Sequence, residues 1–79
     1  MGYLNQEEKE IAEKFVSELF EPAYRYSRNT SYGIKHIFER ATGIYMTNDE
    51  MKYIMLELGY KPNDRTELNP RYKARFKRL

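Results

Sequence analysis

Few side chains in this chain of 79 residues could carry out chemistry. His36 is the single histidine and there is no cysteine, so the usual ligands of a zinc site are missing. His36 falls within a helical pattern, one turn from Tyr32 and Arg40, where a hydrogen-bonded structural histidine is a simpler interpretation than a general base. No glycine-rich phosphate loop, paired-carboxylate signature or nucleophile motif is present. We therefore expect a protein that is not an enzyme, with no catalytic, cofactor-binding or metal-binding residues.

Charge is distributed unevenly along the chain, although the net charge is only +2. Residues 1–21 hold six glutamates against two lysines, whereas residues 61–79 hold seven cations against two carboxylates. In the final segment RYKARFKRL the cations alternate with Tyr72, Ala74 and Phe76. This two-residue period favours a strand that buries the three uncharged residues and leaves the cations in water. A helix capped by Asn69 and beginning at Pro70 is the alternative.

The cations of this tail have two possible roles. Arg65, Lys73, Arg75 and Lys77 could bind the backbone of a nucleic acid, with an exposed Tyr72 or Phe76 stacking on unpaired bases. Alternatively, they only protect an edge strand from aggregation.

Two amphipathic helices, at 31–42 and 47–58, have clear start and stop signals. Thr47 and Glu50 form a capping box at the start of the second helix, and Gly59 ends it. Gly43 ends the first helix. The connection between them has four residues, so we expect helix-turn-helix geometry.

The remaining elements complete a small fold. A helix at 5–21 ends before Pro22, a short edge strand at 23–27 follows, and a hairpin spans 60–77. The predicted fold is a single domain of residues 1–79, mostly α with a small β-hairpin (α+β), winged-helix-like, with three helices and a basic C-terminal wing. The expected centre of the core comprises Phe15, Leu19, Ile37, Phe38, Ile54 and Leu58.

The segment from residue 31 to the tail carries a resemblance. The residues that match are Ser31, Tyr32, Gly33, Lys35, His36, Phe38, Glu39, Gly43, Tyr45, Asn48, Gly59 and Tyr60. With these residues the segment resembles short uncharacterised proteins from phages and mobile elements of low-GC Gram-positive bacteria. It is also similar to the terminal winged-helix segments of phage-type primase-helicases. The resemblance implies a mobile-element setting and a winged-helix-like fold.

The second helix of the pair is a poor reader of the DNA major groove. Its expected outward residues are Asn48, Asp49, Glu50, Lys52, Tyr53 and Glu57. Three carboxylates among them would repel phosphates. We therefore predict that the protein binds and modulates or inhibits a host or phage protein complex that acts on nucleic acid or in defence. The candidate contact residues are Asp49, Glu50, Tyr53, Glu57 and Tyr45.

Direct nucleic-acid binding is the alternative function. In that case the protein is a winged-helix accessory or regulatory protein that uses Arg65, Lys73, Arg75 and Lys77. The apolar runs are interrupted by charge, and no signal peptide pattern is present, so we expect a cytoplasmic protein without a membrane partner. We expect a monomer or a weak homodimer.

Overall fold

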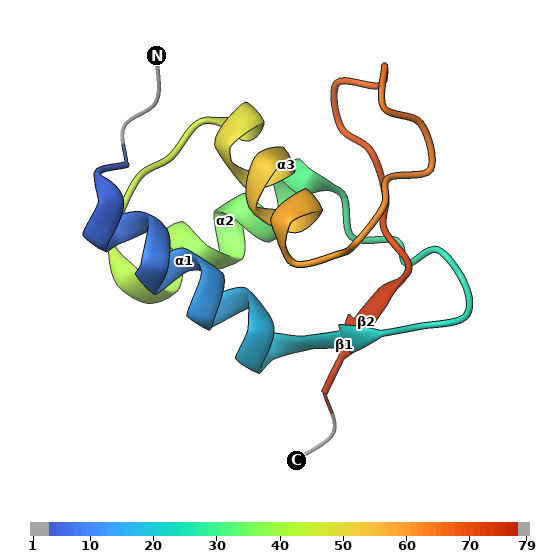
Figure 1. The fold of residues 1–79 in the computed structure, drawn as a ribbon, viewed down its shortest axis with the longest axis horizontal. Helices are drawn as coiled ribbons and strands as arrows, with labels where there is room; N and C mark the ends of the chain where they lie inside the picture. The colour runs from blue at the N-terminus through green and yellow to red at the C-terminus, as the bar shows by residue number, and fades with distance from the viewer. Residues whose placement is uncertain (1–3, 78–79) are drawn as a thin grey trace.

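A computed structural model describes residues 4–77 (Figure 1). Over these residues the chain forms three helices and a two-stranded antiparallel sheet, in the order α1 (Gln6–Leu19), β1 (Phe20–Pro22), α2 (Ser31–Thr42), α3 (Asn48–Glu57) and β2 (Ala74–Phe76). The predicted α+β class is thus confirmed. Within this part of the chain, no helix has the length and apolar character needed to cross a membrane.

The first and third helices begin at the predicted caps, Asn5 and Thr47. Asn5 Oδ1 accepts from the Glu8 amide at 2.8 Å, and Glu8 Oε1 accepts in return from the Asn5 amide at 3.2 Å. The corresponding distances for Thr47 and Glu50 are 3.1 and 2.7 Å. At the end of α2, Gly43 adopts a left-handed conformation with φ 76°, which glycine reaches without a Cβ penalty. Both predicted capping boxes are confirmed.

The core lies where the three helices meet. Phe38 and Ile54 are fully buried, and Phe38 packs edge-on against Phe15 with the ring centroids 5.3 Å apart. The other four residues predicted for the centre of the core lie at its margin, because their side chains are only half-buried: Phe15, Leu19, Ile37 and Leu58. Their places are taken by smaller and more flexible side chains and by residues of the tail: Ala12, Val16, Met46, Met51, Met55, Tyr72 and Ala74.

The first strand lies earlier than predicted. Residues 23–27 are not a strand, because the backbone already becomes extended at Phe20, directly after α1. Phe20 is 1% exposed and stacks on Phe76 with centroids 4.8 Å apart, so burial of this ring ends the helix before Pro22. The predicted helix 5–21 is therefore two residues too long at its end.

The predicted hairpin 60–77 is reduced to a single bridge, because β2 pairs with β1. The register places Phe20 opposite Phe76, Glu21 opposite Arg75 and Pro22 opposite Ala74. Within 60–77, an isolated bridge joins Pro62 to Tyr72, and the Asn63 amide donates to the Arg71 carbonyl at 2.9 Å. Pro62 has no amide hydrogen to donate, so this pairing does not extend into a longer ladder.

The tail is a strand rather than a helix, as the two-residue period predicted. Tyr72 and Ala74 are each 1% exposed, whereas Phe76 is 47% exposed. The alternation therefore holds for the first two uncharged residues, and the third covers Phe20 at the edge of the core.

Asn48 holds the loop before the tail against the helices. Its Oδ1 accepts from the Ser31 hydroxyl at 2.8 Å, and its Nδ2 donates to the Leu68 carbonyl at 2.5 Å and to Asn69 Oδ1 at 3.1 Å. Ser31 is completely buried, and its amide donates to the Pro70 carbonyl at 3.0 Å. The expectation that Asn48 faces outward is thus wrong, because its amide joins α2, α3 and the loop.

We predict that Asn48→Ala lowers the free energy of unfolding by about 1–3 kcal/mol, because the buried Ser31 hydroxyl loses its acceptor. Urea denaturation followed by circular dichroism measures this change. Asn48→Asp keeps the acceptor for Ser31 and loses only the two donated bonds, so its loss of stability should be smaller than that of Asn48→Ala. Equal stability of the wild type and Asn48→Ala would contradict this role.

Candidate functional site

The outer face of α3 holds most of the residues expected to contact a protein partner. Asp49 is exposed and the Tyr53 side chain is 53% exposed. Glu50 has a structural role, because its carboxylate accepts from the Thr47 amide at 2.7 Å and from the Leu4 amide at 2.9 Å. The helix therefore offers Asp49 and Tyr53 to solvent, while Glu50 joins α3 to the start of α1.

Glu57 takes part in a charged cluster between α1 and α3. Lys9 Nζ lies 3.3 Å from Glu57 Oε1 and 4.5 Å from the centroid of the Tyr53 ring. A hydrogen bond between the carboxyl groups of Glu13 and Glu57 raises the pKa of Glu13 and lowers that of Glu57. Contacts within the molecule thus engage the Glu57 carboxylate that sequence reasoning assigned to a partner.

A hollow of about 350 Å³ opens between the start of α1 and the first turns of α3. Apolar groups and charged groups share its lining, which consists of Leu4, Lys9, Thr47, Asp49, Glu50, Tyr53 and Ile54. Three of the five expected partner residues therefore come together here. Tyr45 is 72% exposed in the connection between α2 and α3 and does not line the hollow.

The four cations expected to bind nucleic acid are all exposed. Arg75 lies in β2, and its guanidinium contacts Glu21 of β1 at 2.6 Å. Lys73 lies just before β2, with its ammonium 5.1 Å from the centroid of the Tyr26 ring. Lys77 follows β2, and Arg65 lies in the loop between α3 and the tail.

Sequence reasoning missed two further cations beside this tail. Residues 23–30 run alongside the tail, because the Ser27 amide donates to Tyr72 and the Ala23 amide to Lys73, each at 2.9 Å. Arg25 and Arg28 are thereby brought next to the cations of the C-terminal segment. We call this surface the basic end; its exposed cations are Arg25, Arg28, Lys61, Arg65, Arg71, Lys73, Arg75 and Lys77.

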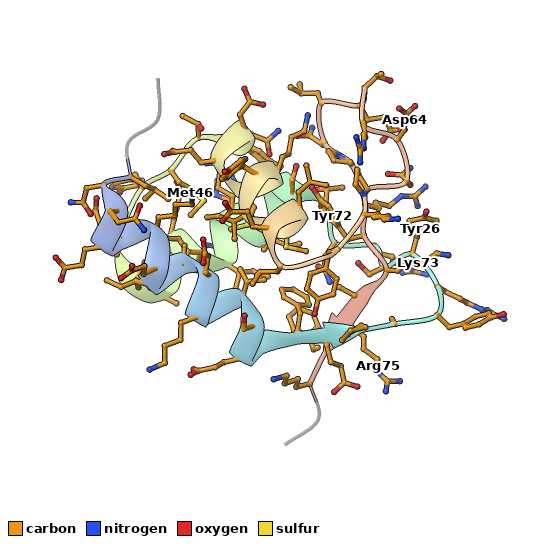
Figure 2. The ribbon with its side chains drawn as sticks, in the orientation of Figure 1. Tyr26, Met46, Asp64, Tyr72, Lys73 and Arg75 are labelled. Atoms are coloured by element: carbon orange, nitrogen blue, oxygen red, sulfur yellow. The ribbon has the colours of Figure 1, made fainter. Side chains whose placement is uncertain are left out.

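The basic end extends from the loop between α3 and β2 to the strands β1 and β2, where the Lys77 amide donates to the carbonyl of Leu19 at the end of α1. Figure 2 shows Tyr26, Lys73 and Arg75 along this surface. Asp64 and Glu67 lie in the same segments, and Glu21 lies in β1, just before residues 23–30. Glu21 contacts Arg75, and hydrogen bonds from Thr66 lower the pKa of Asp64. The eight cations outnumber these three carboxylates, of which Glu21 is paired with Arg75 and Asp64 keeps its negative charge.

The aromatic residues available for stacking differ from those expected. Tyr72 is buried and cannot stack on a base, and burial raises the pKa of its hydroxyl to about 12. Phe76 is half exposed but stacks on Phe20. Tyr24 and Tyr26, with exposed fractions of 94% and 45%, are the accessible rings near the basic cations.

His36 lies in a cluster that stabilises α2. Its ring packs edge-on against Tyr32 with centroids 4.3 Å apart, and its Nδ1 lies 3.6 Å from Glu39 Oε1. Glu39 also accepts from Lys35 at 3.2 Å and from the Met46 amide at 3.0 Å, which holds the connection to α3. Between residues 4 and 77, no three His, Asp or Glu side chains are arranged so that they could hold a metal ion.

No protein-family model, curated protein or solved structure matches this chain.

The Glu13 and Glu57 pair predicts a pH-dependent stability. Because the pKa of Glu13 is raised in the folded state, its protonation stabilises the fold at low pH, and this contribution is lost as the pH rises through that pKa. Glu13→Gln keeps a donor without a charge, so we expect a higher melting temperature than the wild type at neutral pH. The gain should vanish near about pH 4, where the wild-type carboxyl is itself protonated.

Thermal unfolding followed by circular dichroism at the two pH values measures this effect. In a Glu57→Gln background the same substitution should give no gain, because the carboxylate that repels Glu13 is gone. An equal gain at both pH values would contradict the pairing.

Proposed function

We propose that this chain is a small winged-helix-like protein, not an enzyme, that binds nucleic acid through the basic end. The observation that carries the proposal is the pairing of residues 23–30 with the tail, which brings exposed cations of the two segments together, with Lys73 and Arg75 among them (Figure 2). A protein that neutralises phosphates with Lys and Arg gains affinity by releasing counterions. In this proposal the cations hold the backbone and do not read base sequence.

The order and pairing of the elements support the winged-helix part of the proposal. The chain runs through a helix, a strand, two helices and a final strand that pairs with the first. In this proposal the isolated bridge between Pro62 and Tyr72 corresponds to a shortened wing hairpin, with residues 63–71 between its ends. The short connection between α2 and α3 is typical of a helix-turn-helix.

Charge also determines which surface would meet the nucleic acid. A helix-turn-helix protein places its second helix in the major groove, but α3 presents Asp49, Glu50 and Glu57 on that helix. These carboxylates disfavour contact between α3 and phosphates. Because α1 and its glutamates lie on the other side of the molecule from the loop 61–73 (Figure 1), we place the phosphates against the basic end.

The proposal predicts that Arg28→Glu combined with Arg65→Glu weakens oligonucleotide binding at least about tenfold and reduces the slope of log affinity against log salt. Fluorescence anisotropy with a labelled oligonucleotide over a series of salt concentrations measures both quantities. Lys14→Glu combined with Arg40→Glu makes the same change in net charge at exposed positions outside the basic end. If the two double variants bind equally weakly, net charge rather than the basic end governs binding.

The hollow between α1 and α3 supports a second candidate function, docking to a basic surface of a host or phage protein complex that acts on nucleic acid. The protein would then modulate or inhibit that complex by occupying the surface. Tyr53 and Asp49 border the hollow, and exposed tyrosine offers a large contact area at a low entropic cost. The negative charge of Asp49 would favour a basic partner.

The second candidate predicts that Asp49→Lys combined with Tyr53→Ala abolishes capture of a specific protein from host lysate. The measurement is a pull-down with and without nuclease treatment, followed by mass spectrometry. Glu18→Lys, an exposed change on α1 outside the hollow, is the control and should retain capture. Capture that disappears on nuclease treatment, or that survives the double variant, would contradict this function.

A further inference from the structure

A second hollow, of about 310 Å³, lies within the basic end. Four segments of the chain form it: the end of β1, the stretch after it, the turn that ends α3, and the residue before β2. Its lining consists of Pro22, Ala23, Tyr26, Leu58, Gly59, Tyr60, Lys61 and Lys73. The volume is at the lower end of the range of about 300–1,000 Å³ that small-molecule sites occupy.

The hollow combines aromatic rings with two lysines. Tyr26 is 45% exposed and stands at its rim, whereas Tyr60 is 9% exposed and contributes to the wall. Gly59 has φ 89°, and the turn it makes lets the Tyr60 amide donate to the Met55 carbonyl at 2.9 Å. Leu58 and Tyr60 thus give the hollow an apolar and aromatic lining, which Lys61 and Lys73 complete.

The ammonium of Lys73 lies over the Tyr26 ring at 5.1 Å from its centroid, as expected for a cation–π contact (Figure 2). This contact is at an exposed position and is therefore weak. A flat aromatic group could replace the ammonium on the ring, and the displaced lysine would then reach a phosphate of the same ligand. Lys61, on the other segment, is available for the next phosphate.

From this arrangement we propose that the second hollow binds an unpaired base of a single-stranded nucleic acid, with the base stacked on Tyr26 and the flanking phosphates bound by Lys61 and Lys73. This inference rests on the proposed function of the basic end and adds a preference for single strands. In a duplex the faces of the bases are covered by their neighbours, so only an unpaired base can offer a face to a tyrosine ring. Stacking tolerates any base, because every base has a flat aromatic face.

The test compares four labelled oligonucleotides of about twelve nucleotides: oligothymidylate, oligouridylate, a duplex, and a strand of abasic residues with the same backbone. Binding is measured by fluorescence anisotropy at fixed salt. We expect the full chain to bind the two single strands about tenfold tighter than the abasic strand. The difference between the thymidylate and uridylate strands shows whether DNA or RNA is preferred.

Substitutions then locate the stacking contact. Tyr26→Ala should weaken binding of the base-bearing single strands about tenfold and leave the duplex and abasic strand unchanged, whereas Tyr26→Phe should bind as the wild type. Tyr24→Ala is the matched control, because Tyr24 is more exposed, lies two residues away and does not line the hollow. Thermal unfolding of each variant checks that its fold is retained.

Three results would overturn the inference: equal affinity of the wild type for the base-bearing and abasic strands, no effect of Tyr26→Ala, or the same loss in Tyr24→Ala. The abasic comparison uses the wild type alone, so it holds even if Tyr26→Ala does not fold. If duplex and single strand bind equally and Arg28→Glu with Arg65→Glu weakens both, this inference fails and the proposed function stands. If the wild type binds none of the four oligonucleotides, both fail.

Discussion

The hydrogen bonds of the Asn48 side chain connect α2, α3 and the loop before the tail, which burial of apolar side chains alone would not align. A domain of this size has a small apolar core, so its exposed segments receive little guidance from the hydrophobic effect. The Asn48 amide joins the buried Ser31 at the start of α2 to the Leu68 carbonyl in the loop before the tail. Because Ser31 is fully buried, this polar link has a well-defined geometry and few alternatives.

The path of the tail follows from this link. With the loop held at Leu68 and Asn69, the Pro70 carbonyl accepts from the Ser31 amide, and the chain then enters the core with Tyr72 and Ala74. Because the segment runs in this direction, β2 pairs with β1 and not with the residues that follow α3. The same path places the tail beside residues 23–30, so the packing that completes the core also assembles the basic end.

The two candidate surfaces differ in how much of their charge the molecule itself neutralises. On the acidic side, Glu57 contacts Lys9, and Glu50 accepts from two backbone amides, which leaves Asp49 and Tyr53 as the accessible groups. At the basic end, the contact between Arg75 and Glu21 and the stacking of Lys73 on Tyr26 involve exposed side chains that solvent screens. The hollow of α1 and α3 and the basic end do not share a lining residue, so a partner on one leaves the other accessible.

Local interactions determined what could be predicted from the sequence, and long-range packing decided the rest. The caps at Asn5 and Thr47 and the stop at Gly43 involve residues a few positions apart, so local chemistry was enough to predict where α1 and α3 begin and where α2 ends. The pairing of β2, the inward turn of Asn48 and the meeting of Arg28 with the tail each depend on residues far apart in the chain. The alternation of cations with uncharged residues predicted a strand at the tail. It could not predict which segment pairs with that strand, because the alternation shows which side chains share a face and does not identify the neighbouring strand. The basic end and its hollow are therefore properties of the tertiary structure, since only the path of the loop brings their residues together.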